Sequence, residues 1–113
     1  METFEELERL RDELNKSVET LRAKGEELSK AEHDYKVVLS YYSIDLKNRG
    51  YSASMIDKVV YGYKSVAELR MKRDTAQTLY DVNKEQINII KLNIRIVMTQ
   101  LQLDYGLAGQ GGY

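Results

Sequence analysis

The residues of this chain that could do acid-base or metal chemistry are one histidine and a group of acids near the amino-terminal end. His33 stands between Glu32 and Asp34 on a charged stretch, where a solvated helical position is expected. A metal site needs ligands that converge on one face, and histidine catalysis needs a positioned partner. The amino-terminal acids instead scatter around the first helical turns, where carboxylates favour the helix dipole; they are Glu5, Glu6, Glu8, Asp12 and Glu13. We therefore expect no metal ion and no cofactor.

The composition removes most other classes of catalysis. The 113-residue chain contains no cysteine and no proline, which excludes thiol catalysis, disulfides and cysteine-based zinc sites. The stretch GQGG near the carboxyl end follows no expected strand and opens no expected helix, so it does not fit a phosphate-binding loop. The sequence predicts a protein that is not an enzyme.

A basic, tyrosine-rich segment is the region whose residue types most suggest binding. Six of the nine tyrosines fall between residues 35 and 63, and residues 35–75 hold 8 bases against 4 acids. Aromatic rings among cations can stack bases and neutralise phosphates, but tyrosine and arginine also anchor protein interfaces or simply pack between helices. The net charge of −1 argues against binding DNA by charge. The candidate residues are Tyr41, Lys47, Arg49, Tyr51, Lys58, Tyr61, Tyr63 and Lys64.

Capping signals divide the chain into two long helices and a short one. Thr3 with Glu6, and Ser65 with Glu68, fit capping boxes. KNRG places two cations before a glycine, Gly50, that suits a left-handed helix end. We predict helices at about 4–49, 53–61 and 66–105, forming one domain over 1–106, and a flexible tail at 107–113. The expected fold is all-α, a long antiparallel helical hairpin of the coiled-coil type with the short helix at its tip.

Apolar residues recur with a period of seven in both long helices, which is the pattern of a coiled-coil seam. In the first helix one row is Leu7, Leu14, Leu21, Leu28, Tyr35 and Tyr42, and the expected alternate row is Phe4, Arg11, Val18, Gly25, Glu32, Leu39 and Leu46. In the last helix the seam is Val66, Leu69, Arg73, Ala76, Tyr80, Asn83, Ile87, Ile90, Ile94, Val97, Leu101 and Asp104.

One antiparallel register lets the polar seam residues satisfy each other. Burying a carboxylate without a partner costs several kcal/mol, which disfavours a slip of one heptad. The register also sets a small residue against a large one and a ring beside a cation. The predicted pairs are Arg11 with Asp104, Glu32 with Asn83, Gly25 with Ile90 and Tyr42 with Arg73.

The last helix carries a second apolar row, on a side roughly opposite its seam. A solvated surface helix has only one apolar stripe, so a helix with two must be covered on both sides. The row is nearly symmetric about its middle, which lets two copies pack antiparallel in a twofold four-helix bundle. We therefore predict a homodimer, with a foreign protein or another part of the chain as alternative covers. The interface residues are Val82, Ile89, Leu92, Ile96 and Leu103.

No part of the sequence suggests a membrane or secretory location. No apolar run approaches the ~18 residues of a membrane span. The first residues, METFEELERL, lack the basic start and apolar core of a signal peptide. We expect a cytoplasmic protein that does not contact a membrane.

The segment NRGYSASMIDKVVYGYKSVAELRMKRDTAQTLYD, residues 48–81, resembles small uncharacterised helical accessory proteins of phages and prophages of Gram-positive bacteria. The likeness lies in the glycine after a long helix, the short capped helix, and VAELRMKRDTAQTLY opening a second long helix. It covers about residues 45–105 in arrangement. The resemblance implies a phage accessory protein in the host bacterial cytoplasm, of a kind often encoded near recombination or replication functions or among anti-defence genes. It implies no catalytic residue.

Three functions fit these observations. The first is a non-enzymatic phage-type accessory protein that binds another protein, as an inhibitor of a bacterial defence system or another host machine. The second is an accessory factor in phage DNA recombination or replication that binds single-stranded nucleic acid through the basic, tyrosine-rich tip. The third is a purely structural helical spacer.

Overall fold

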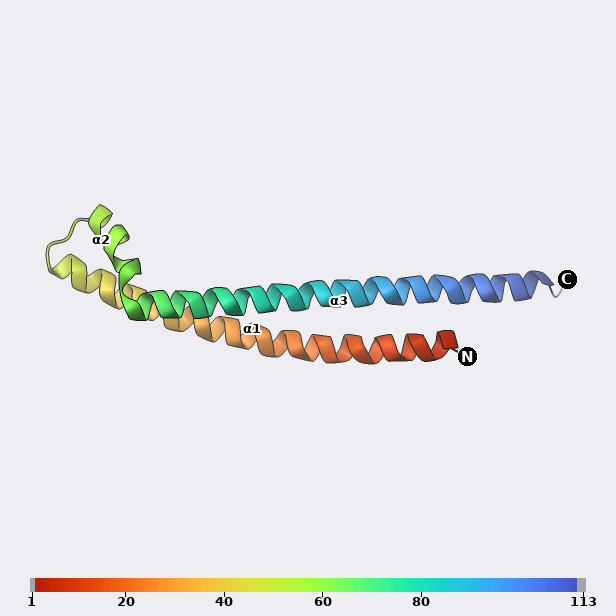
Figure 1. Cartoon of the computed structure of the whole chain (residues 1–113). Helices are drawn as coiled ribbons and strands as arrows, with labels where there is room; N and C mark the ends of the chain where they lie inside the picture. Colours follow the sequence, from red (N-terminus) through yellow and green to blue (C-terminus); the bar gives the residue numbers. More distant parts are fainter. Residues whose placement is uncertain (1, 112–113) are drawn as a thin grey trace. The chain divides into compact units, whose positions relative to one another are not determined.

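The computed structural model describes the backbone of residues 2–111 and the side chains of residues 3–106. Its elements are α1 (Glu2–Asn48), α2 (Ala53–Val59), the 3-10 helix η1 (Val60–Gly62) and α3 (Lys64–Gly111) (Figure 1). Every element in this range is helical, and the two long helices pack antiparallel with the short helix between them in sequence. The prediction of an all-α fold is confirmed.

The helix bounds differ from the predicted ones mainly at the carboxyl end. α3 continues to Gly111, past the expected end near Gly106. Glycine weakens a helix by about 1 kcal/mol per residue but leaves its hydrogen bonds intact, so it does not force an end. The flexible tail was predicted at 107–113. The side chains of these residues, and the backbone of 112 and 113, lie outside the described residues.

The chain divides into two compact units that share the long helices. Unit 1 contains Met1–Arg22 and Val82–Tyr113, and unit 2 contains Ala23–Asp81. Unit 1 therefore pairs the start of α1 with the later part of α3. Unit 2 holds the rest of α1, the short helices and the start of α3.

The connection after α1 follows the expected capping chemistry. Gly50 has a φ of 91°, and the amide of Tyr51 donates to the carbonyl oxygen of Leu46 at 3.1 Å. A left-handed residue followed by this backward hydrogen bond is a glycine-based helix end, as predicted. The Ser52 hydroxyl then accepts from the amide of Met55 at 3.4 Å and caps α2.

The two predicted capping boxes are wrong. Both threonine and serine lie inside their helices, because α1 begins at Glu2 and α3 begins at Lys64. Their acidic partners are used differently: Glu6 pairs with Arg9, and Glu68 lies 3.9 Å from the ammonium of Lys64. A carboxylate in the first turn can serve a neighbouring cation as readily as a backbone amide.

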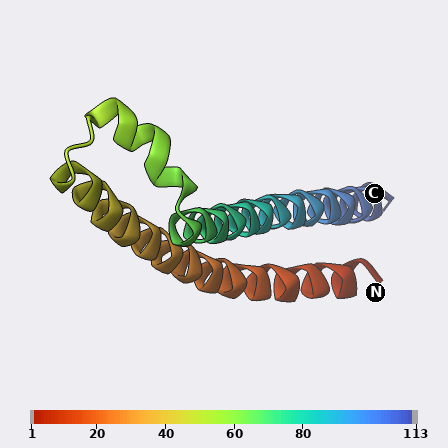
Figure 2. The same cartoon turned by 60° about the vertical axis from the view of Figure 1, so that its left-hand side comes forward.

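The core of unit 2 joins three elements. Leu46 of α1, Val60 of η1 and Val66 of α3 are almost fully buried. Tyr42 stacks on Tyr63 beside them, with ring centroids 4.4 Å apart. α2 itself buries no residue, so it is held through η1 and the chain on either side of it (Figure 2).

The seam of α3 is confirmed from Val66 to Leu101, and that of α1 is confirmed in the Leu7 row throughout and in the alternate row from Gly25 to Leu46. The predicted α3 residues from Val66 to Leu101 are all buried or half-buried. The Leu7 row of α1 is also buried or half-buried, but Phe4, Arg11 and Val18 of the alternate row are exposed. Leu10 is buried and Ser17 half-buried in their place. In unit 1, the inner face of α1 is therefore completed by Leu10 and Ser17, which lie three residues after Leu7 and Leu14. Ser17 is small and polar, so the apolar pattern did not reveal this row.

The predicted register is also wrong. Arg73 places its guanidinium 4.7 Å from the ring centroid of Tyr35, which lies one heptad before the expected Tyr42. A Cβ on Gly25 would meet the ring of Tyr80 at 3.4 Å, so Tyr80 stands where Ile90 was expected.

The polar residues of the seam find other partners as well. Asn83 is buried and donates to the carbonyl oxygen of Ser17 at 3.0 Å, instead of pairing with Glu32. Asp104 is exposed and accepts from Gln100 at 3.1 Å, and Arg11 is exposed too. The argument against a one-heptad slip was that it would bury the carboxylate of Asp104 without a partner. That argument does not hold, because Asp104 is exposed.

Candidate functional site

The clearest candidate site is an apolar row on α3 in unit 1, which we call the outer row. It consists of the predicted interface residues Val82, Ile89, Leu92, Ile96 and Leu103. Each keeps between 50% and 58% of its surface exposed. Large exposed apolar residues gathered along one helix mark an interaction surface more often than residues scattered singly. The structure therefore leaves this predicted surface open within the described chain.

Two residues of the outer row, Ile89 and Ile96, lie beside α1. Ile89 lines a shallow hollow together with Glu13 and Lys16 of α1. Ile96 lines a second hollow with Thr3 and Glu6 of α1. The predicted position roughly opposite the seam is therefore corrected for Ile89 and Ile96, since side chains of α1 border the same hollows.

Uncharged polar residues join four members of the outer row, all except Leu92, in a second surface that we call the α3 face. Gln86 and Asn93 line the hollow at Ile89, and Gln100 lines the hollow at Ile96. The α3 face comprises Val82, Gln86, Ile89, Asn93, Ile96, Gln100 and Leu103, which follow one another at spacings of three and four. A partner helix on this face would desolvate no ionised side chain of α3, which removes the largest cost of burying a polar surface.

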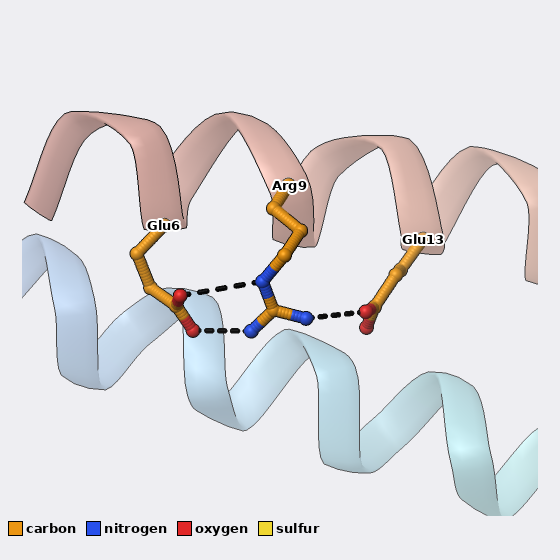
Figure 3. A network of polar contacts seen from close by, with 3 residues as sticks. All are labelled: Glu6, Arg9 and Glu13. Atoms are coloured by element: carbon orange, nitrogen blue, oxygen red, sulfur yellow. Dashed lines mark hydrogen bonds and ion pairs between the residues drawn. The ribbon is translucent and has the colours of Figure 1, made fainter. Parts of the chain in front are cut away.

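The border of the α3 face on α1 is charged (Figure 3). The guanidinium of Arg9 lies between the carboxylates of Glu6 and Glu13, with Nη1 2.5 Å from Oε1 of Glu13 and Nε 3.3 Å from Oε2 of Glu6. Hydrogen bonding to Glu6, the charge of Glu6 and then the charge of Glu13 raise the pKa of Arg9 above its ordinary value. These ions are exposed, so the network adds little stability. It keeps this edge polar.

The tyrosines predicted to form a binding tip are largely engaged inside unit 2. Arg70 covers the ring of Tyr61, with its guanidinium carbon 4.9 Å from the ring centroid. Tyr63 stacks on Tyr42, and Tyr41 meets Tyr42 edge-on at 5.3 Å. None of these contacts joins two of the eight predicted tip residues. Three of the four predicted tyrosines therefore have one ring contact each with another residue of unit 2.

The predicted cations of the tip divide in the same way. Arg49 lies 3.1 Å from the carboxylate of Asp45, and Lys64 pairs with Glu68. Lys47, Lys58 and Tyr51 are exposed. The positive charge of this region is therefore partly neutralised by neighbours one helical turn away.

A second apolar surface was missed by the sequence interpretation. Val37, Tyr41 and Ile44 of α1 lie at spacings of four and three and are 54%, 66% and 59% exposed. Tyr41 was considered only for its aromatic type. The helical spacing of Val37 and Ile44 around it was the available signal.

Unit 2 also has shallow hollows on α3 that the sequence interpretation missed. Met71, Thr75 and Leu79 line two of them, one shared with Tyr61 and the other with Ala31. Met71 and Leu79 are exposed. Their separation by eight residues, two helical turns, was readable from the sequence.

The described residues contain no group of three or more His, Asp or Glu side chains placed to hold a metal ion. His33 is exposed, with Nδ1 3.3 Å from the carboxylate of its neighbour Asp34. No helix in the described part of the chain is long and apolar enough to cross a membrane.

These features define a class of protein, namely an all-α chain of antiparallel helices with apolar faces left uncovered. No protein-family model, curated protein or solved structure matches the chain. The resemblance of residues 48–81 to phage accessory proteins stays a prediction.

Proposed function

We propose that this chain is a non-enzymatic protein that acts by binding other proteins, with the α3 face as its main binding surface. The observation that carries the proposal is the half exposure of all five residues of the outer row. Fully burying one aliphatic side chain contributes about 1.5–3 kcal/mol, so completing the burial of these five contributes roughly 5 kcal/mol. That amount is offset in part by the cost of association.

The first partner in this proposal is a second copy of the chain. Two outer rows packed together contribute about 10 kcal/mol, which is enough to exceed the lower range of association costs. The result is a homodimer with a four-helix contact. The separate exposed row at Val37, Tyr41 and Ile44 then offers unit 2 for a further protein.

The biological setting we propose is that of a phage accessory protein that inhibits a bacterial defence system or another host machine. Its support is the resemblance of residues 48–81 together with the exposed apolar surfaces. In this setting, the dimer would present two copies of the unit 2 surface to its target, which strengthens binding through effective concentration.

The proposal is tested by substituting Ile96→Lys and comparing it with Met98→Lys. Both positions are exposed apolar residues on α3, but Met98 is not part of the α3 face. Light scattering over a range of concentrations should give the mass of two chains for the wild type and for Met98→Lys at high concentration. Ile96→Lys should give the 13.1 kDa of one chain, because a lysine would be buried in the dimer.

Capture from bacterial lysate supplies the second measurement. The proposal is contradicted by a wild-type chain that stays at one-chain mass and also captures no more protein than Ile96→Lys does.

A further inference from the structure

Met71, Thr75 and Leu79 form a ridge on α3 between two hollows of unit 2, and we call it the unit 2 ridge. All three residues line both hollows. Met71 is 67% exposed and Leu79 is 44% exposed, and Thr75 is exposed as well. Residues four apart lie on the same side of a helix. The ridge therefore presents a row of uncharged side chains to solvent.

The hollows on the two sides of the ridge are nearly equal in volume, about 510 and 520 Å³. Ala67 lines the first hollow, and Ala31 of α1 and Ala76 of α3 line the second. A small molecule in one hollow would leave the other empty. A helix that lies along the ridge can place side chains in both, which is the ridges-into-grooves packing of two helices.

The cations that line the hollows have no anionic partner. Arg70 lines the first hollow, and Lys30 and Lys72 line the second. None of the three makes an ion pair within the described part of the chain. The guanidinium of Arg70 covers the ring of Tyr61. Stacking uses the face of the guanidinium and leaves its N–H donors, which lie in the plane, for a carboxylate.

The acids that line the hollows are already paired. Asp74, in the first hollow, lies 2.9 Å from the guanidinium of Arg73. Glu27, in the second hollow, lies 3.6 Å from the ammonium of Lys24. The charges left unmatched in both hollows are therefore positive.

Two other acids on this part of α3 line neither hollow. Glu68 lies 3.9 Å from the ammonium of Lys64, and Asp81 accepts a hydrogen bond from Gln77 at 3.1 Å. They leave the unmatched cations of the hollows available to a partner.

We infer that the unit 2 ridge docks an acidic amphipathic helix of another protein, whose apolar stripe covers the ridge and whose edge carboxylates meet the unmatched cations of the two hollows. Charges that flank an apolar seam between helices select the partner, and positive flanks select glutamate or aspartate. This inference rests on the proposed protein-binding function and adds a surface made of residues outside the α3 face.

A second copy of the ridge would match only one of its sides. An antiparallel pairing about Thr75 sets Met71 against Leu79, since these residues are equally far from it. It brings Asp81 of the other copy toward Arg70. Lys72, however, would face Thr78 and receive no carboxylate. An acidic helix supplies carboxylates to both sides.

A displayed peptide library tests the inference on the full-length chain. Each peptide has about three heptads, with Leu at positions a and d and Glu, Gln or Lys in random order at positions e and g. Selection on the wild-type chain should enrich Glu at the edge positions, because the unmatched charges of the ridge are positive. Binding of the selected peptides should weaken as the salt concentration rises.

Substitutions at exposed positions then locate the bound peptide. Met71→Lys should weaken binding of the selected peptides at least about tenfold, because a lysine would be buried under the apolar stripe. Lys72→Glu should weaken it roughly fivefold, because an attractive pair becomes repulsive. Lys58→Glu, an equal change of charge outside both hollows, is the control. Ile96→Lys, on the α3 face, should also leave peptide binding unchanged.

Three outcomes overturn the inference. The first is a selection that recovers no binding peptide or does not enrich Glu. The second is peptide binding that Ile96→Lys abolishes and Met71→Lys leaves unchanged, because the peptides then occupy the α3 face. The third is a two-chain mass in light scattering that Met71→Lys reduces to one chain, because the ridge is then covered by a second copy. The second and third outcomes leave the proposed protein-binding function standing.

Discussion

Two glycine-to-alanine substitutions should change stability in opposite directions. Gly25 lies within α1, where glycine is less favourable than alanine by about 1 kcal/mol. A Cβ at this position would lie 3.4 Å from the Tyr80 ring, which is an ordinary van der Waals contact. We expect Gly25→Ala to raise the free energy of unfolding by about 0.5–1 kcal/mol.

The same substitution at Gly50 has the opposite sign. Gly50 has a φ of +91° with nothing within 4 Å of an added Cβ. The cost is therefore purely one of backbone conformation, about 1–2 kcal/mol for a residue with a side chain. The two variants add the same methyl group, so the difference between them, roughly 2 kcal/mol, isolates the backbone and packing effects.

Thermal and urea denaturation followed by circular dichroism measure both effects. The midpoints should move by about 3–6 °C, upward for Gly25→Ala and downward for Gly50→Ala. All variants must be compared at one chain concentration, since self-association raises the apparent midpoint. A double-mutant cycle with Tyr80→Leu then tests the contact itself. Destabilisation by Gly25→Ala, with no coupling to Tyr80, would refute the observed helix register.

Two further substitutions test the core and the seam. Leu46→Ala should lower the free energy of unfolding by about 2–5 kcal/mol, because Leu46 is almost fully buried. Ile44 is two residues away and exposed, so Ile44→Ala should lower the free energy of unfolding by less than about 1 kcal/mol in the same urea titration. Similar losses for the two variants would contradict the described core of unit 2. Asn83→Ala should lower the free energy of unfolding by about 0.5–1.5 kcal/mol through loss of its hydrogen bond to Ser17, whereas an increase in stability, measured by urea denaturation, would show that this bond does not form.

The sequence predicted the faces of α3 better than those of α1. The inner row of α3 is made mostly of large apolar residues, so its period is visible directly. In α1, Val18 is more apolar than Ser17, and pattern reading placed Val18 in the seam. The structure exposes Val18 and half-buries Ser17, because a small residue lets the facing helix approach and leaves its carbonyl oxygen accessible to Asn83.

The helix register was not predictable from polar matching. The prediction assumed that Arg11 and Asp104 were buried and needed each other. Both are exposed, so neither constrains the pairing, and packing of Tyr35, Tyr80 and Gly25 accompanies a different alignment. The charged border of the α3 face was not predicted for the same reason. The side of α3 that lies beside Glu13 depends on how the helices are rotated about the seam, and polar matching does not fix that rotation.

Residue type and exposed apolar area point to different candidate binding surfaces. The tyrosines and cations near residues 35–75 have the composition of a ligand site, yet Tyr63 is stacked and Tyr61 is covered by a cation within unit 2. The aliphatic residues of the outer row carry no chemical signature, but they remain half exposed at five positions along one helix. A contact already made inside the fold leaves less of a side chain free for a ligand, whereas exposed apolar surface gains free energy when a partner covers it. The α3 face is therefore a surface where covering by a partner would lower the free energy.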